Sequence, residues 1–351
     1  MILAGDIGGT KTNLALFDAK GGGSHATHSP AVKYQSAKHD SLEAILAEFV
    51  TKLASSQPRV EITAACFGVA GPVVGDEVKT PNLAWTVKLA ALKRALGTSR
   101  VSLINDLEAT AYGIEDLSQQ QYHALNEGAR GGVPHRALIA AGTGLGMAGI
   151  FWNGAHYQPI ASEGGHIDFA PRNETEIALL RYLQMKLGGH VSYERVVSGS
   201  GLVNIYNFLR DGQHAAEAAS LAEKIGNSED AAATISAAAL SGESGLARRA
   251  LEMFVEIYGA MAGNLALTLK PYGGLYVGGG IAPKILEVLK GGAFMRAFTD
   301  KGRMSSLAAS FPVRVILDDQ TALYGAARYA ASGDSTAVTQ KENISPTNAR
   351  A

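Results

Sequence analysis

Residues 1–18 read MILAGDIGGTKTNLALFD and contain the segment DIGGTKT, from Asp6 to Thr12. Two adjacent glycines join two apolar stretches, as in a loop whose backbone amides bind phosphate, but the spacing fits neither G-x-x-x-x-G-K-[ST] nor G-x-G-x-x-G. A parallel crossover would need a dozen residues or more, so the two stretches are predicted to form an antiparallel hairpin. We therefore expect a phosphate-binding turn between antiparallel strands.

Strand-like and helix-like segments alternate along the rest of the chain. Short apolar runs that end in Gly or Asp predict strands, and apolar residues at helical spacing predict helices. The predicted strands are residues 2–9, 12–18, 62–71, 101–106, 137–144, 274–280 and 313–319, and the predicted helices are residues 41–54, 87–97, 174–188 and 245–269. This alternation is typical of an α/β protein.

Composition limits the classes of partner. The chain has 351 residues, a formal net charge of −1 and 46% hydrophobic residues, which suggests two domains with large cores. Lys and Arg are scattered, so no nucleic-acid partner is expected. No run of about 18 apolar residues predicts a transmembrane helix, and the start lacks a signal-peptide pattern. The single cysteine, Cys66, excludes an internal disulfide, and a cytoplasmic protein with no membrane partner is expected.

Two further glycine clusters follow predicted strands. AAGTGLGMAG spans residues 140–149 and leads into another apolar stretch, and YVGGGIAP spans residues 276–283 and leads towards a helix. Glycine lets backbone amides approach a ligand closely, and successive amides can bind phosphate oxygens. Each cluster alone is typical of an ordinary tight turn. Three such glycine turns in this order indicate a shared function.

The order of the three turns resembles the ATPase fold shared by sugar kinases, actin and the heat-shock chaperones. The resemblance implies an α/β protein with the two-domain actin-like ATPase (ribonuclease H-like) fold and a cleft between a small and a large lobe. The small domain would comprise residues 1–112 and 312–330, and the large domain residues 113–311. Residues 331–351 lack apolar periodicity and are predicted to be a disordered tail.

This resemblance also implies ATP and Mg²⁺ as cofactors. The first two turns would hold the β- and γ-phosphates, and the third would lie against adenosine. Asp6 would face the Mg²⁺ through water, because Mg²⁺ keeps most of its hydration shell. The implied nucleotide-binding residues are Gly5, Asp6, Ile7, Gly8, Gly9, Thr10, Gly142, Thr143, Gly144, Gly278, Gly279 and Gly280.

The segments between the turns resemble the bacterial glucokinase family from Leu3 to about Ala330. The matching motifs are FGVAGPV (67–73), TPNLAW (80–85), LINDLEATAYGI (103–114), SEGGHIDFAP (162–171) and HVSYERVVSGSGLVNIY (190–206). ROK-type sugar kinases share DIGGTK but carry a zinc site of several cysteines, which one cysteine cannot form. The resemblance implies a homodimer that transfers phosphate from ATP to the 6-hydroxyl of D-glucose, feeding glycolysis.

Asp106 is the predicted catalytic residue. It ends a strand at the carboxyl edge of a sheet, where open α/β folds bind ligands. Alone, an Asp at this position is equally typical of a helix N-cap. The resemblance makes Asp106 the general base for the sugar hydroxyl and gives Asn105 a hydrogen bond to a ring hydroxyl.

Glu163, His166 and Glu194 are the other predicted glucose-binding residues. Glu163 and His166 flank a Gly-Gly turn, so their side chains can converge on one small ligand. The spacing of His166 and Asp168 also suggests a metal, but no third ligand lies close in sequence. Glu194 alone could be a first-turn helix acid after Ser192, and only the family pattern gives it the sugar role.

Three other functions fit parts of the pattern. A kinase for another hexose or amino sugar would keep every phosphate turn and change only the pocket. A sugar-sensing transcriptional regulator would carry a DNA-binding helix pair before the first strand. A filament or chaperone ATPase would hydrolyse ATP without a sugar and lack the Asn-Asp pair and the Glu/His set.

Overall fold

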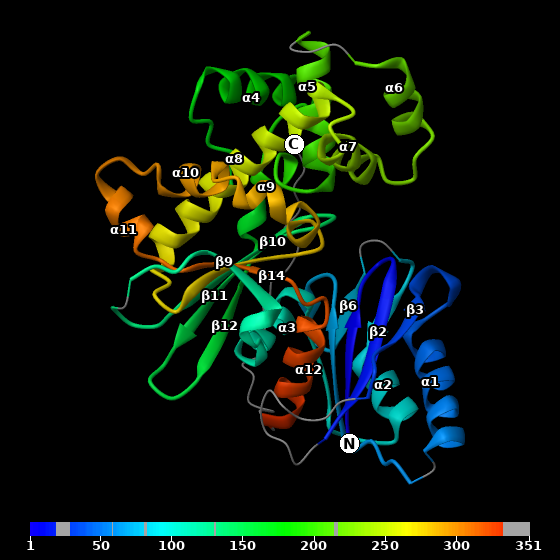
Figure 1. Cartoon of the computed structure of the whole chain (residues 1–351). Helices are drawn as coiled ribbons and strands as arrows, with labels where there is room; N and C mark the ends of the chain where they lie inside the picture. The colour runs from blue at the N-terminus through cyan, green and yellow to red at the C-terminus, as the bar shows by residue number, and fades with distance from the viewer. Residues whose placement is uncertain (19–28, 58, 81–82, 130, 214–216, 333–351) are drawn as a thin grey trace, which may run out of the picture. The chain divides into compact units, whose positions relative to one another are not determined.

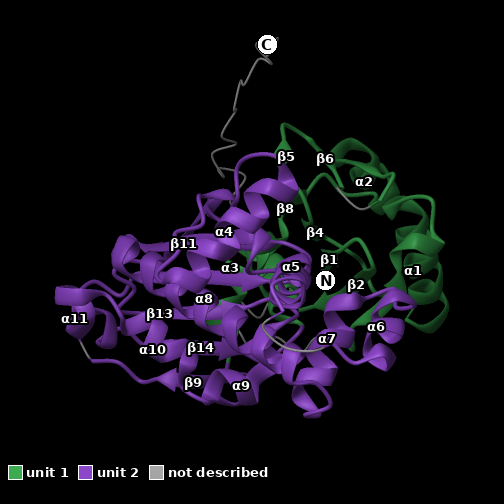
Figure 2. Cartoon of the chain, turned by 90° about the horizontal axis from the view of Figure 1, so that it is seen from above, with its two compact units in different colours: residues 1–117, 320–351 green, residues 118–319 purple. Residues whose placement is uncertain are grey.

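The computed structural model describes residues 1–18, 29–57, 59–80, 83–129, 131–213 and 217–332 (Figure 1). The chain divides into two compact units, coloured separately in Figure 2. Unit 1 comprises Met1–Leu117 and Gln320–Ala351, and unit 2 comprises Ser118–Asp319. The boundaries expected from sequence, after residues 112 and 311, lie a few residues away. The second lies later than expected because the strand at 313–316 pairs within the sheet of unit 2. Most of the predicted tail, residues 333–351, lies outside the described residues.

Unit 1 contains a five-stranded sheet with the order β3-β2-β1-β4-β8. β1 pairs antiparallel with β2, and β1, β4 and β8 are parallel neighbours, so the predicted hairpin is confirmed. A second, three-stranded sheet has the order β5-β6-β7. The elements are β1 Ile2–Ile7, β2 Lys11–Phe17, β3 Val32–Gln35, η1 Ser36–Lys38, α1 Leu42–Ser56, β4 Ala64–Val69, β5 Val73–Val74, β6 Glu77–Lys79, β7 Thr86–Lys88, α2 Leu89–Leu96, β8 Val101–Asn105, α3 Asp106–Gly113, η2 Ile114–Asp116 and α12 Thr321–Ser332.

The sheet of unit 1 is covered on both faces. Alternate residues of β1 point to opposite faces, as strand geometry requires: Leu3 and Ile7 join the core beneath α1 and α2, and Ile2 and Ala4 join the core beneath α3 and α12. Burial on both faces explains why β4 is apolar throughout rather than alternating.

Unit 2 contains a six-stranded sheet with the order β12-β11-β10-β13-β14-β9. Its central arrangement repeats that of unit 1, because β10 pairs antiparallel with β11 and parallel with β13. The elements are η3 Gln119–Gln121, β9 Tyr122–Asn126, β10 Arg136–Ala141, β11 Leu145–Trp152, β12 Tyr157–Ser162, η4 Gly164–His166, α4 Glu174–Leu187, η5 Tyr193–Arg195, α5 Gly199–Asp211, α6 Ala219–Gly226, α7 Ala231–Leu240, α8 Gly245–Leu269, β13 Gly274–Gly278, η6 Ala282–Ile285, α9 Leu286–Lys290, α10 Ala293–Thr299, η7 Gly302–Met304, α11 Ser305–Ala309 and β14 Val313–Ile316.

Helix α8 is the centre of the core of unit 2 (Figure 1). Gly259 and Gly263 lie on the side facing α10, where an added Cβ would lie 2.2 Å from Phe294 O and 2.3 Å from Phe298 O, respectively. These glycines let the two helices approach closely. Among the described residues, no helix has the length and apolar composition needed to span a membrane.

Candidate active site

The first glycine turn joins β1 to β2 and is held from behind by Ser36. Ser36 is fully buried, its Oγ donates to Gly8 O at 2.8 Å, and its backbone N–H donates to Thr10 O at 3.1 Å. Within the described residues, the N–H groups of Gly9 and Thr10 have no acceptor. The turn therefore presents two fixed donors for an anion.

Asp6 lies on β1 directly opposite Asn13 on β2. Asn13 Nδ2 donates to Asp6 Oδ2 at 3.1 Å, whereas the buried Asn13 Oδ1 has no partner among the described residues. An unmatched buried carbonyl costs about 1–3 kcal/mol, so this atom marks a place for water or a ligand. Carboxylate and amide oxygens are the hard ligands that suit Mg²⁺, which needs few protein ligands because it retains water and substrate phosphates.

The second glycine turn joins β10 to β11 and repeats this arrangement. Gly142 N donates to Gly144 O at 2.9 Å, and the N–H groups of Thr143 and Gly144 have no acceptor in the described part of the chain. An added Cβ on Gly142 would meet nothing within 4 Å. The turn is therefore open to a ligand on that side.

The third glycine turn, residues 278–280, packs against the second. Ile281 N donates to Ala141 O at 3.2 Å, and Gly279 has φ of 81°, with its added Cβ only 2.2 Å from the same carbonyl. Gly279 is alone among the predicted nucleotide-binding glycines in having a positive φ. Gly5 is required for packing instead, since its added Cβ would lie 2.4 Å from the Phe67 ring.

Asn105 and Asp106 lie where β8 meets α3. The N-cap of α3 is Asn105, not Asp106: Asn105 Oδ1 accepts from Leu107 N at 2.9 Å, and its Nδ2 donates to Gly71 O at 3.0 Å. Asp106 Oδ1 also accepts from Leu107 N, at 2.9 Å. Burial raises the pKa of Asp106 above its ordinary value, although these hydrogen bonds oppose the shift.

The side chains of Glu163 and His166 lie close to each other. The two residues lie at either end of the η4 turn that follows β12, with Glu163 Oε2 3.9 Å from His166 Nε2. Both side chains are largely exposed, which leaves their polar atoms available to a ligand. Asp168 pairs instead with His190, at 2.7 Å. No cluster of three or more His, Cys, Asp or Glu that could hold a metal occurs among the described residues.

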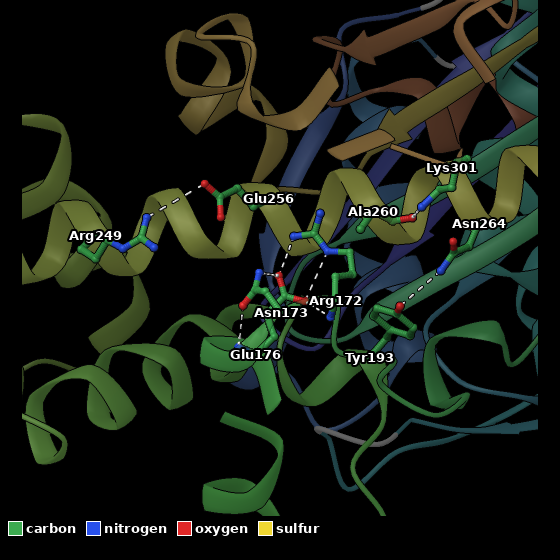
Figure 3. Close-up of polar contacts among 9 residues, drawn as sticks. All are labelled: Arg172, Asn173, Glu176, Tyr193, Arg249, Glu256, Ala260, Asn264 and Lys301. Carbon is green, nitrogen blue, oxygen red and sulfur yellow. Dashed lines mark hydrogen bonds and ion pairs between the residues drawn. The ribbon is translucent and has the colours of Figure 1, made fainter. Parts of the chain in front are cut away.

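Glu194 lies in η5, with its carboxylate against the second glycine turn. Glu194 Oε2 accepts from Leu145 N at 3.0 Å. The preceding residue, Tyr193, is buried, and its hydroxyl accepts from Asn264 Nδ2 of α8 at 3.2 Å (Figure 3). Burial raises the pKa of the Tyr193 hydroxyl. Tyr193 N also donates to Ile167 O at 3.0 Å, which joins η5 to the segment that follows His166.

The buried Glu176 anchors the other end of this segment. Glu176 Oε1 accepts from Arg172 Nη2 at 2.5 Å, and Asn173 caps α4 by accepting from Glu176 N (Figure 3). A buried carboxylate needs such pairing to be tolerated. The chain between Glu163 and α4 is therefore tied down at both ends.

Several supporting residues were not predicted from sequence. Tyr258 of α8 is fully buried, accepts from Ala141 N and donates towards Ile139 O, each at 3.3 Å, beneath the second turn. Asn13 and Ser36 support the first turn in a similar way. Only Asn13 had a usable signal, because hairpin register places it opposite Asp6.

The predicted sugar-site residues fall into two groups. Asn105 and Asp106 belong to unit 1, and Glu163, His166 and Glu194 belong to unit 2. The nucleotide-binding turns are divided in the same way, the first in unit 1 and the other two in unit 2.

Known proteins resemble the chain over nearly its whole length. The family model described as Glucokinase matches residues 3–333. A glucokinase from Nostoc punctiforme is 44% identical over 343 residues, covering 94% of this chain and 99% of that protein. The crystal structure of a glucokinase from an Antarctic psychrotroph superposes with a TM-score of 0.80 at 30% identity, covering 94% of this chain and 98% of that one.

A more distant structure shows the fold alone. A ROK-family glucokinase from Streptomyces griseus, solved in complex with glucose and AMPPNP, has a TM-score of 0.62 at 22% identity, covering 94% of this chain and 99% of that one. Together these likenesses confirm the actin-like ATPase fold that the order of the glycine turns predicted.

Proposed function

The chain belongs to the glucokinase family and phosphorylates glucose, and we propose that Asp106 is the general base and that ATP with Mg²⁺ is the phosphoryl donor. The observation that supports the proposal best is the placement of Asp106 directly after β8, at the first residue of α3. Its Oδ1 is held by Leu107 N, which leaves Oδ2 to accept a proton. Burial raises its pKa, which strengthens it as a base.

The proposed reaction is an in-line displacement. The 6-hydroxyl oxygen of glucose attacks the γ-phosphorus of ATP. The bond between the γ-phosphorus and the β-phosphate oxygen breaks, which releases ADP, and the hydroxyl proton passes to Asp106. The N–H groups of Gly9, Thr10, Thr143 and Gly144 would bind phosphate oxygens. When bound, Mg²⁺ would neutralise the negative charge of the phosphates. Asp6 would hold it through water, and Asn13 Oδ1 offers a further acceptor for that water.

The remaining sugar hydroxyls would bind Asn105, Glu163, His166 and Glu194. Hydroxyls donate to carboxylates in charge-assisted hydrogen bonds, which are stronger than neutral ones. A site that pairs each hydroxyl rejects a sugar with one missing or misplaced, because a buried polar group is left unmatched. We therefore expect glucose to be preferred over other hexoses and amino sugars.

A panel of sugars and phosphoryl donors tests this proposal. Purified protein is supplied with glucose, mannose, fructose or glucosamine and with ATP, ADP or polyphosphate, with and without Mg²⁺, and sugar phosphate is measured directly. We expect glucose 6-phosphate from glucose, ATP and Mg²⁺ at the highest kcat/KM. A higher kcat/KM for another sugar, or equal turnover with polyphosphate, would contradict it.

We also propose that the enzyme is a cytoplasmic homodimer. A cytoplasmic location supplies ATP, and most soluble oligomers are symmetric homo-oligomers, with dimers commonest. Analytical ultracentrifugation over a range of concentrations tests the dimer, and a constant mass of one chain would exclude it. Fractionation of the source cells tests the location.

A further inference from the structure

One short segment, residues 194–199, contacts both ends of the second glycine turn. At one end, Glu194 Oε2 accepts from Leu145 N at 3.0 Å. At the other end, Gly199 N donates to Gly142 O at 2.8 Å. Both ends of the turn are therefore held by the same six-residue stretch of chain.

The contact with Glu194 is close enough to depend on Gly144. A Cβ added to Gly144 would lie 2.6 Å from Glu194 Oε2. Real Cβ atoms do not approach an oxygen this closely, so a side chain at position 144 would force the carboxylate to move. The end of a glutamate side chain can move without disturbing the backbone.

The segment itself is held from the far side of the turn. The hydroxyl of Ser198 donates to Glu194 O at 2.7 Å and accepts from Gly201 N at 3.0 Å, as the N-cap of α5. Tyr193, bonded to Asn264 of α8, fixes the start of η5 (Figure 3). A displaced Glu194 carboxylate would therefore move relative to a fixed backbone.

We propose that Glu194 is a positioning residue for the nucleotide-binding turn as well as a glucose ligand, and that this shared carboxylate couples the binding of the two substrates. The inference rests on the proposed function, in which Glu194 accepts from a sugar hydroxyl. A carboxylate has about four lone-pair sites, so Glu194 can accept from Leu145 N and from a hydroxyl at the same time. Bound glucose would then hold the Glu194 carboxylate in place, and this carboxylate holds the second glycine turn through Leu145 N.

Coupling of this kind acts in both directions. If glucose raises the affinity for nucleotide by some factor, nucleotide raises the affinity for glucose by the same factor. A change in the turn that displaces the Glu194 carboxylate should therefore alter glucose binding without nucleotide present. A change in Glu194 should likewise alter nucleotide binding without glucose present.

The first experiment changes the turn and measures glucose by calorimetry in the absence of nucleotide. Gly144→Ala should weaken glucose binding about tenfold, the scale of one hydrogen bond to a charged group. Gly142→Ala is the matched control, because it adds the same methyl group to the same turn where nothing lies within 4 Å. Its glucose affinity should equal that of the wild type. Equal glucose affinity of both variants and the wild type would overturn the inference.

The second experiment changes the sugar residues and measures binding of AMPPNP with Mg²⁺ in the absence of glucose. Glu194→Ala should bind AMPPNP several-fold more weakly than the wild type. Glu163→Ala removes another proposed sugar ligand, which lies 3.9 Å from His166, and should bind AMPPNP normally. Equal AMPPNP affinity of the two variants would overturn the inference even if Gly144→Ala failed to fold.

Failure of the inference can be told apart from failure of the proposed function. If Glu194→Ala loses glucose binding while Gly144→Ala keeps it, Glu194 is a sugar ligand without a positioning role. If Glu194→Ala binds glucose normally, its role as a sugar ligand is wrong, and the coupling through it falls as well.

Discussion

Asp106 shows how one residue's surroundings suit it to its proposed role. Burial makes its ionised form costly, and the hydrogen bond from Leu107 N only partly offsets that cost. Because Asn105 already caps α3, Asp106 is not needed as the cap. The proposed catalytic role therefore explains an Asp at position 106 better than helix capping does.

The first prediction concerns turnover. Asp106→Asn keeps the shape and the acceptor for Leu107 N but cannot take a proton, so kcat should fall by about 10²–10⁴. That fall corresponds to roughly 3–5 kcal/mol at the transition state. Glucose affinity, measured by calorimetry, should change much less, because other residues hold the remaining hydroxyls. Near-normal kcat would exclude Asp106 as the general base.

The second prediction concerns stability and follows from the raised pKa. A carboxyl whose folded pKa lies above its ordinary value of 3.8 favours the folded state only when protonated, and this contribution is lost as pH rises through the folded value. Asp106→Asn never carries the buried charge. At pH 7 its melting temperature should therefore equal or exceed that of the wild type, and the difference should shrink as pH falls towards 3.8. A clearly lower melting temperature at pH 7 would show that the carboxylate stabilises the fold.

At the scale of elements, the third turn combines two glycines with different demands. Gly279 has a positive φ and almost touches the backbone of β10, whereas an added Cβ on Gly280 meets nothing within 4 Å. Gly279 is therefore required for folding, whereas Gly280 leaves space for a ligand.

The third prediction compares these neighbours. Gly279→Ala should lower the free energy of unfolding by at least about 2 kcal/mol, because both its backbone angle and its contact with Ala141 O are unfavourable for a side chain. Gly280→Ala should unfold at the wild-type urea concentration but bind ATP more weakly, since the methyl group occupies the open side. Equal urea midpoints for the two variants would refute this.

The elements that sequence predicted are those with strong burial patterns. β1, β2, β4, β10, β13 and β14 were expected because most of their residues are buried, and β8 was expected because it lies in a short apolar run that ends at Asp106. β12 was not expected, because none of its residues is buried and most are exposed. β9 was not expected either, because all its residues are partly buried and show no two-residue period. The site residues that the sequence predicted lie in glycine turns and at polar strand ends, which are patterns of neighbouring residues. Tyr258 supports Ala141 from 117 positions away, and no local pattern can indicate that.

In the whole molecule, the strands next to the glycine turn are arranged in the same way in both units. In each, the first strand of the turn pairs antiparallel on one side and parallel on the other. Each unit also has its own hydrophobic core, in two layers in unit 1. The proposed glucose ligands are divided between the two units.

The fourth prediction is that glucose alone slows amide hydrogen exchange in both units. Protection should appear in the segment from β8 to α3 of unit 1 and in η4 and η5 of unit 2, because Asp106, Glu163 and Glu194 would all bind the same sugar. Mass spectrometry of peptides with D-glucose, and with L-glucose as the control, measures this. Protection confined to unit 2 would argue against a sugar role for Asn105 and Asp106.

Unit 1 is assembled from the two ends of the chain, and this bears on how the protein is made. Leu323, Ala326 and Tyr329 of α12 cover the face of β1 and β4 that holds Ile2 and Cys66. At about 5–20 residues per second, a ribosome needs roughly 10–40 s to add the intervening residues of unit 2. For that time one apolar face of the newly made N-terminal sheet lacks α12 and is covered only in part, by α3. A nascent chain that stalls before Thr321 would therefore present to chaperones, or to other unfinished chains, a surface that the finished enzyme never exposes.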